Sequence, residues 1–379
     1  MKRVVILYGG KSGEHEVSLQ SAASIVRHLD KELFDPILVS IDKEGAWLLQ
    51  GPHVLARALA GEPRLAIGAG ARVFIAPASG LIAADAGVNV PIPCDVVFPV
   101  LHGTFGEDGT IQGLLEVAGL PYVGAPVMGS ALGMDKEKAK RLWQAEGLPV
   151  VPFVLARMGE ESKPESLARL ALEVGKRFGW PAFVKPACAG SSVGASRVKD
   201  ESDLGRALKE ALEWDDKVLI EPLVTATEIE CSVLGNGDPR AFPPGEIVPS
   251  HEFYDYEAKY IDPDGAALIL PAKIEEDLSR RVRDLAVKAY KALDLAGMAR
   301  VDFFVDKKSG EVLLNEVNTI PGFTNISMYP KMCEIGGLEY SKLISELIEL
   351  ALSRHEERKR LRYSFESETQ PITNIPFCF

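Results

Sequence analysis

Residues 300–318, RVDFFVDKKSGEVLLNEVN, decide the fold that we expect for this chain. Apolar and polar residues alternate on both sides of a central turn, and this pattern predicts a β-hairpin. A side-chain period of two puts Arg300 and Asp302 on one face of the first strand, and Glu316 and Asn318 on one face of the second. If these faces align when the strands pair, Asp302 lies opposite Glu316.

The polar face of this hairpin indicates a metal site. Two like charges directly opposite each other destabilise a sheet unless a cation lies between them. Mg²⁺ prefers one or two carboxylates together with water and substrate phosphates. Asp302 and Glu316, with the amide of Asn318, therefore predict a magnesium site that also contacts phosphate. The alternative is an amphipathic hairpin whose acidic face is solvated.

A loop rich in glycine and serine follows another apolar strand. Lys185 ends that strand, and the run GSSVG follows at 190–194. Successive backbone amides in such a loop can enclose a polyphosphate, and glycine permits close approach. Lys136 and Lys185 can each place an ammonium group against phosphate oxygens. The run also fits the GxSxG motif of hydrolases, but neither downstream histidine, His251 or His355, lies in a context that supports a catalytic triad.

A Pro-Gly pair follows the second strand of the hairpin. The backbone amide of Gly322 can donate to an oxyanion beside Arg300, although an ordinary turn glycine is the alternative. Together, the lysines, the loop and the acidic hairpin predict an ATP-binding cleft, and Arg300 with Gly322 predicts an acyl-transfer site next to it.

Composition limits the class of protein. The chain has 379 residues, enough for two or three domains, and its 46% apolar and 25% charged residues are typical of a folded soluble protein. A net charge of -12 disfavours nucleic acid and anionic membranes as partners. The five cysteines are scattered and form no metal-ligand spacing, and no stretch approaches the roughly 20 apolar residues of a membrane span. We expect a cytoplasmic protein.

The N-terminal third is expected to be an α/β domain. Apolar strand patterns at 4–8, 36–41 and 96–100, with a helical pattern at 17–29, predict a parallel sheet covered by helices. Residues 51–93 are rich in Gly, Ala and Pro and have weak periodicity, which predicts a loosely structured insertion.

Two further modules follow. Strong helix formers at 136–145, ended by Gly147 and Pro149, mark a domain boundary near Asp135. Strand and helix patterns then alternate, and the last residues have no periodicity. We therefore expect domains at 1–134, 135–227 and 228–362, and a frayed tail at 363–379.

Seven motifs occur in order along nearly the whole chain. They are GGKSGEHEVS (9–18), HGTFGEDGTIQG (102–113), MDKEKAK (134–140), VKPACAGSSVG (184–194), FYDYEAKY (253–260), RVDFF (300–304) and NEVNTIPGFTNISMYP (315–330). In this combination they resemble the ATP-grasp superfamily and, much more closely, the D-alanine–D-alanine ligase family. The resemblance implies three domains, with ATP held between the central and C-terminal ones, a lid at 248–265, and the D-alanine site reaching into the N-terminal domain.

The resemblance also implies the groups that hold the nucleotide and metal. Ser191 to Gly194 resemble the phosphate loop, and Asp302, Glu316 and Asn318 resemble the ligands of two Mg²⁺ or Mn²⁺ ions. The remaining residues that resemble ATP ligands are Lys136, Lys185, Ser192, Val193, Glu221, Leu223, Glu228 and Lys259.

The amino-acid sites are implied in the same way. Glu14 resembles the acceptor for the ammonium group of the first D-alanine, and His102 lies near that substrate's carboxylate. Ser327 and Met328 resemble the site for the second carboxylate. Tyr260, on the lid, is typical of ligases that prefer D-alanine to D-lactate as second substrate. The residues expected to be catalytic are Glu14, Ser191, Tyr260, Arg300 and Gly322.

The implied reaction joins two D-alanines for peptidoglycan synthesis. The first carboxylate attacks the γ-phosphate of ATP, and the second amine attacks the resulting acyl phosphate. A homodimer is usual in the family. Two alternatives remain: a D-alanine–D-lactate or D-serine ligase, which Tyr260 disfavours, and a nucleotide-binding regulator without activity, which the complete set of lysines and carboxylates disfavours.

Overall fold

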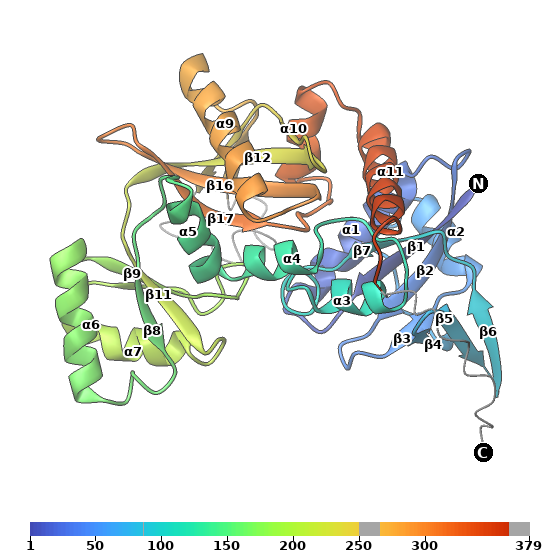
Figure 1. Cartoon of the computed structure of the whole chain (residues 1–379), viewed down its shortest axis with the longest axis horizontal. Coiled ribbons are helices and arrows are strands. Elements are labelled where there is room, and N and C mark those ends of the chain that lie inside the picture. Colours follow the sequence, from blue (N-terminus) through green and yellow to red (C-terminus); the bar gives the residue numbers. More distant parts are fainter. Residues whose placement is uncertain (86, 250–265, 364–379) are drawn as a thin grey trace.

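The computed structural model describes residues 1–85, 87–249 and 266–363. Three β-sheets, each with its own helices, follow one another along the chain (Figure 1). The sheets span residues 2–100, 154–222 and 226–318, so the third begins two residues before the expected boundary at 228. We call these parts the N-terminal, central and C-terminal domains.

The N-terminal sheet has seven strands in the order β6-β5-β4-β3-β2-β1-β7. Its parallel part is formed by β1 (Lys2–Gly9), β2 (Phe34–Ile41) and β7 (Val96–Val100), as the apolar runs predicted. The helices of this domain are α1 (His15–His28), α2 (Pro52–Leu59), α3 (Thr110–Val117) and α4 (Val127–Met134).

The expectation of a loose insertion at residues 51–93 is wrong. This segment contributes α2 and an antiparallel extension of the sheet, whose side chains Val73, Leu81 and Ile92 are buried. Short strands with many small residues carry too few large apolar side chains to show a period of two. The extension is formed by β3 (Trp47–Leu49), β4 (Ala71–Ala76), β5 (Gly80–Asp85) and β6 (Val88–Ile92).

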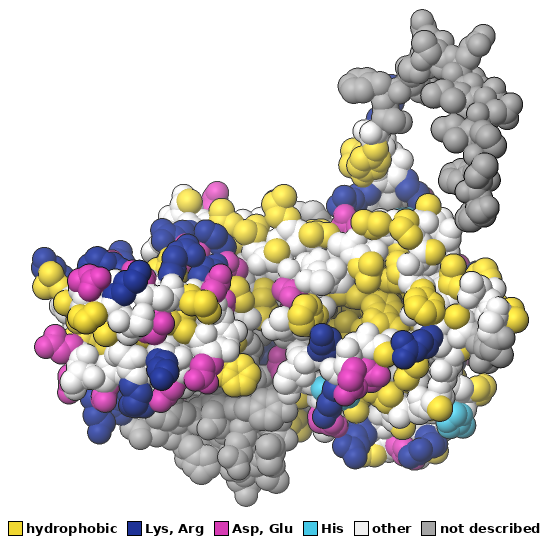
Figure 2. All heavy atoms as spheres, turned by 90° about the horizontal axis from the view of Figure 1, so that it is seen from below, with side chains coloured by type: hydrophobic (Ala, Val, Ile, Leu, Met, Phe, Trp, Pro, Cys, Tyr) yellow, Lys and Arg dark blue, Asp and Glu magenta, His cyan; other side chains and the backbone are white. Residues whose placement is uncertain are grey.

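The central domain is an antiparallel sheet in the order β10-β9-β11-β8. Helices α6 (Pro164–Arg177) and α7 (Glu201–Ala211) pack on it around a separate hydrophobic core. Figure 2 shows that positive and negative side chains are interspersed over this domain, at the left of the view. The strands are β8 (Val154–Arg157), β9 (Ala182–Pro186), β10 (Ser196–Val198) and β11 (Lys217–Pro222).

The C-terminal sheet is antiparallel, with the order β15-β14-β12-β16-β17, and β13 pairs with β12. Its strands are β12 (Ala226–Gly235), β13 (Arg240–Ala241), β14 (Gly245–Pro249), β15 (Ala266–Ile269), β16 (Gly297–Asp306) and β17 (Val312–Asn318). Its helices are α9 (Glu276–Ala292), α10 (Met328–Ile335) and α11 (Tyr340–Arg358).

Strands β16 and β17 form the predicted hairpin in the predicted register. Asp302 lies opposite Glu316, and Arg300 lies opposite Asn318, which confirms the prediction. Beyond Asp302 the register shifts by one residue, so that Phe303 faces Leu314. This β-bulge leaves Asn315 without a partner across the ladder, and it brings Asn315 and Glu316 to the same cavity.

The core explains how the domains are joined. One hydrophobic cluster combines strands β1 and β7 of the N-terminal domain with α10 and α11 of the C-terminal domain, and Figure 1 shows α11 beside the N-terminal sheet. Helix α5 (Lys136–Ala145) precedes the central sheet but packs its Ala139 and Trp143 into the C-terminal core. The indole of Trp143 donates to the carbonyl of Ala289 on α9 at 3.0 Å. Within the described residues, no helix has the length and apolar character to cross a membrane.

Candidate active site

A cavity of about 620 Å³ lies between the central and C-terminal sheets. Its walls come from β9, β11, β12, β16 and β17, and from the loop that follows β9. Eleven of the residues predicted from the sequence line it, namely Lys136, Lys185, Ser191, Ser192, Val193, Glu221, Leu223, Glu228, Arg300, Asp302 and Glu316. The cavity therefore collects the predicted nucleotide and metal groups from two domains.

Three acidic side chains line up across neighbouring strands at the floor of this cavity. Asp302 of β16 lies between Glu230 of β12 and Glu316 of β17. The guanidinium of Arg300 donates to both Asp302 oxygens at 2.8 and 2.7 Å and lies 3.1 Å from Glu230 Oε2. The amide of Asn318 donates to Asp302 Oδ2 at 2.9 Å. The repulsion expected across the hairpin is thus offset by donors on the same face.

These oxygens fit a hard cation. In the described part of the chain, no three carboxylate, imidazole or thiolate groups converge as a preformed metal site. Two opposed carboxylates with a neighbouring amide are nevertheless the donor set that Mg²⁺ uses when phosphate and water complete its shell. A bound ion would take over Asp302 oxygens that now accept hydrogen bonds from Arg300 and Asn318.

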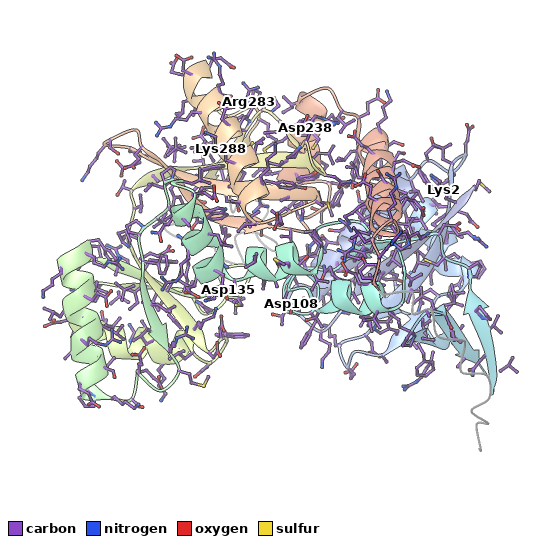
Figure 3. The ribbon with its side chains drawn as sticks, in the orientation of Figure 1. Lys2, Asp108, Asp135, Asp238, Arg283 and Lys288 are labelled. Carbon is purple, nitrogen blue, oxygen red and sulfur yellow. The ribbon has the colours of Figure 1, made fainter. Side chains whose placement is uncertain are left out.

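Lys136 contacts both β17 and the loop that follows β9. Its ammonium donates to the carbonyl of Ala189 at 2.8 Å and lies 3.4 Å from Glu316 Oε2. Asp135 fixes the position of Lys136, because its side chain accepts from the backbone amides of Glu137 and Lys138 and caps α5. Asp135, labelled in Figure 3, lies at the junction of α4 and α5.

Lys185, the second predicted phosphate lysine, lies near the end of β9. Its ammonium donates to Asn315 Oδ1 at 2.9 Å and lies 2.8 Å from Glu221 Oε2. The other oxygen of Glu221 lies 2.7 Å from the ammonium of Lys140. Burial works against ionisation of Glu221, but the two lysines outweigh it and lower the pKa of this carboxyl. Glu221 is therefore a carboxylate held between two ammonium groups.

The loop at residues 190–194, which the sequence predicts to bind phosphate, has an unusual backbone conformation. Ser191 and Ser192 have φ angles of 50° and 58°, in the left-handed region, and Gly194 has a φ of 69°. Such angles are unfavourable for residues other than glycine by roughly 1–2 kcal/mol each. The Ser191 hydroxyl donates to Glu14 Oε1 at 2.6 Å. A side chain at Gly190 would come within 2.9 Å of Glu14 Oε2, so this glycine permits the close approach.

Glu14 belongs to the N-terminal domain, where it lies near a second buried group. His102 Nδ1 donates to the carbonyl of Ile320 at 2.9 Å, so Nε2 is the nitrogen that accepts from the hydroxyl of Ser21, at 3.3 Å. Burial lowers the pKa of His102, which is therefore neutral. The predicted pair Glu14 and His102 thus lies at the junction of all three domains.

A buried carboxyl that the sequence did not single out fixes this junction. Glu107 accepts from the amide of Gly103 at 2.7 Å and from the amide of Ile320 at 2.9 Å. Burial, and secondly the charge of Glu14, raise the pKa of Glu107 to about 8. Glu107 therefore connects the loop after β7 to the segment that follows β17.

Gly322, Ser327 and Met328 lie close together after β17, and none of them is among the residues that line the 620 Å³ cavity. Ser327 Oγ accepts from the amide of Thr324 at 2.9 Å, and a side chain at Gly322 would meet this hydroxyl at 2.7 Å. Met328 begins α10, but its side chain is buried against Gly245. Only its backbone amide, at the start of a helix, is suited to an anion. Lys259 and Tyr260 lie outside the described residues.

Four polar residues of the site were not predicted. Lys140 follows Lys136 by one helical turn within a motif that was noted, and Glu230 follows Glu228 by one strand period. Either spacing could have identified its residue from the sequence. Asn315 and Glu107 also lie within quoted motifs, but no spacing singled them out, because the first depends on the bulge and the second on a contact between domains.

Two sheets that enclose a cavity lined by lysines and carboxylates are the arrangement of the ATP-grasp class of enzymes. The family models described as D-ala D-ala ligase N-terminus and D-ala D-ala ligase C-terminus match residues 3–125 and 142–349. The chain belongs to the D-alanine–D-alanine ligase family.

Individual relatives agree with this assignment. The chain is 48% identical to the D-alanine–D-alanine ligase of Treponema denticola, over 95% of this chain and 98% of the relative, and 50% identical to that of Thermoanaerobacter pseudethanolicus, over 95% and 99%. Its fold is similar to the solved D-alanine–D-alanine ligase of Coxiella burnetii, with a TM-score of 0.81, 37% identity, and coverage of 95% and 98%. It is also similar to the VanG D-Ala:D-Ser ligase of Enterococcus faecalis, with a TM-score of 0.79, 35% identity, and coverage of 92% and 99%.

Proposed function

We propose that this cleft joins two D-alanine molecules into D-alanyl-D-alanine at the expense of ATP, for peptidoglycan synthesis. One observation carries the proposal: Ser191 of the phosphate loop donates to Glu14 of the N-terminal domain. This contact brings the proposed nucleotide groups and the proposed amino-acid groups into one continuous site.

The nucleotide lies in the cavity between the central and C-terminal sheets. Lys136 and Lys185 bind its phosphates, and the amides of the 191–194 loop enclose them. Glu221, which lies 2.8 Å from Lys185, and Leu223 complete the nucleotide site from the same wall, and Glu228 contacts the ribose. Lys259 contributes from the 248–265 lid, outside the described residues.

Asp302, Glu316 and Asn318 would hold two Mg²⁺ or Mn²⁺ ions. When bound, the ions offset the charge that develops on the phosphates during transfer. Arg300, which here donates to both oxygens of Asp302, would donate to the oxygen of the reacting carbonyl. The amide of Gly322 donates to the same oxyanion.

Glu14 accepts the ammonium group of the first D-alanine, and His102 lies near its carboxylate. That carboxylate attacks the γ-phosphate, which gives D-alanyl phosphate and ADP. Ser327 and the Met328 amide hold the carboxylate of the second D-alanine. Its amine attacks the acyl carbon, phosphate leaves, and the peptide bond forms.

Product analysis tests this function. Incubation with ATP, Mg²⁺ and D-alanine should release ADP and phosphate in step with D-alanyl-D-alanine, which mass spectrometry identifies. D-serine and D-lactate are the competing second substrates, since one structural neighbour is named a D-Ala:D-Ser ligase. An equimolar mixture that yields mainly D-alanyl-D-serine or an ester would overturn the choice of product. Tyr260→Phe tests the lid, with a shift toward ester expected.

We propose further that the enzyme is a cytoplasmic homodimer. Analytical ultracentrifugation should give twice the mass of one chain, and a single-chain mass at micromolar concentration would contradict this. Fractionation of producing cells should find the activity with cytoplasmic markers.

A further inference from the structure

Lys140 is a buried cation to which the proposed reaction gives no role. It lies on α5 one turn after Lys136, and its side chain is fully buried. Its ammonium is 2.7 Å from Glu221 Oε1 and donates to the carbonyl of Val151 at 3.2 Å. A buried ammonium is costly unless it is paired, and the structure provides both an opposite charge and a carbonyl.

Glu221 connects this buried lysine to the cavity. Its second oxygen lies 2.8 Å from Lys185, which with Glu221 lines the nucleotide cavity. Lys185 lies diagonally across the ladder between β9 and β11 from Glu221, because Leu219 is its direct partner. The three groups therefore form a line, Lys140–Glu221–Lys185, that begins in the core and ends at the cavity.

The charges along this line matter because they are poorly screened. Two ammonium groups and one carboxylate leave one net positive charge, and Lys185 is the member of the line that can present it to phosphate. Without Lys140, the buried Glu221 carboxylate would be left with Lys185 as its remaining cation. The pair would then be neutral, and Lys185 would be drawn toward Glu221 instead of a phosphate oxygen.

We propose that Lys140 is a positioning residue for nucleotide binding: it holds one oxygen of Glu221 so that the other orients Lys185, and it keeps the Lys140–Glu221–Lys185 line positively charged. This inference rests on the proposed role of the cavity as the ATP site. It predicts that Lys140 affects the nucleotide half of the reaction while the amino-acid half is unchanged.

The test compares Lys140→Met with Lys138→Met, a matched control on the same helix whose side chain is half exposed and pairs with Glu137. Steady-state kinetics on the full chain should show a ten- to hundredfold rise in the KM for ATP, about the effect of losing a hydrogen bond to a charged group. The KM for D-alanine should stay within twofold, and Lys138→Met should match the wild type in both constants. A Lys140→Met protein whose KM for ATP is within twofold of wild type overturns the proposal, as does an equal rise in both KM values.

Two further measurements keep the proposal testable if Lys140→Met does not fold. Lys140→Gln retains an N–H donor to Glu221 without the charge, and the same difference between the KM for ATP and the KM for D-alanine is expected.

In the wild type, burial and the charge of Lys185 lower the pKa of Lys140 to about 8, against the opposing charges of Glu221 and Glu316. Calorimetric affinity for ADP should therefore fall between pH 7 and pH 9, and a constant affinity would contradict the inference. Wild-type protein that binds no ADP at either pH refutes the ATP site itself, which separates the two failures.

Discussion

The joint between the N-terminal and C-terminal domains differs in kind from the joint between the central and C-terminal domains. The first is a shared hydrophobic core, in which Phe98 packs edge-on against Phe323 with ring centroids 6.1 Å apart. The second is a polar cleft crossed by contacts such as that between Lys185 and Asn315. A shared core resists relative motion, whereas polar contacts over a cavity can break and form again. The proposed D-alanine groups thus lie at a fixed joint, and the proposed ATP groups at a joint that can open.

The largest expected effect comes from the polar joint. Asp302→Asn combined with Glu316→Gln keeps the shape of both side chains but removes the charges proposed to hold metal. We expect D-alanine-dependent phosphate release to fall about 10⁴-fold, equivalent to about 5 kcal/mol in activation free energy. Circular dichroism should stay unchanged. An undiminished rate would refute the metal assignment.

A substitution in the shared core should destabilise the N-terminal and C-terminal domains together. Phe323→Ala removes a fully buried ring, and we expect a loss of roughly 4 kcal/mol in the free energy of unfolding. Hydrogen exchange should then increase in both the N-terminal and C-terminal domains. The matched change Leu170→Ala, in the separate core of the central domain, should increase exchange there alone. If Phe323→Ala increased hydrogen exchange in one domain only, the shared core would not couple the stabilities of the two domains.

One contact runs from the fixed joint to the movable one, and its loss should have a smaller effect. Ser191→Ala removes the hydroxyl that donates to Glu14 at 2.6 Å. We expect kcat/KM for D-alanine to fall about ten- to hundredfold, the usual effect of losing a hydrogen bond to a charged group. Ser353→Ala is the control, because Ser353 also donates to a glutamate but on the exposed face of α11. Equal kinetics for the two variants would rule out Ser191 as a catalytic group.

The smallest effect should appear in the pH dependence of stability at the fixed joint. The pKa of Glu107 is raised to about 8, so between its ordinary value of about 4.3 and pH 8 the folded chain binds a proton that the unfolded chain releases. Stability should therefore fall as pH rises through this window. Glu107→Gln has no titratable group at this position. Between pH 6 and 7, its free energy of unfolding should therefore fall less steeply than that of the wild type, with slopes that differ by about 1 kcal/mol per pH unit. Parallel pH profiles would contradict the assignment.

Local patterns predicted the hairpin because its register depends on residues close together in the chain. Alternation in residues 300–318 was sufficient to place Asp302 opposite Glu316. The same local reasoning failed for residues 51–93, where small side chains hide the period of strands that nevertheless pair.

The supporting residues of the site could not be predicted in this way. Asn315 reaches the cleft through a bulge that no pattern specifies, and Lys140 meets Glu221 only once α5 has packed beside the central sheet. Glu107 has a partner only in another domain. Motifs marked the groups that are proposed to touch substrates, while the groups behind them depend on tertiary contacts.

The anchoring of α5 has a mechanical consequence. Trp143 fastens the helix in the C-terminal core, while Lys136 and Lys140 reach across to Ala189 and Glu221 of the central domain. Because α5 is fixed to the C-terminal domain and contacts the central domain through these lysines, it can serve as the hinge between the two domains. We therefore expect the central domain to rotate about α5, so that Lys136 and Lys140 keep their contacts while α6 and α7, the helices farthest from this axis in Figure 1, move most.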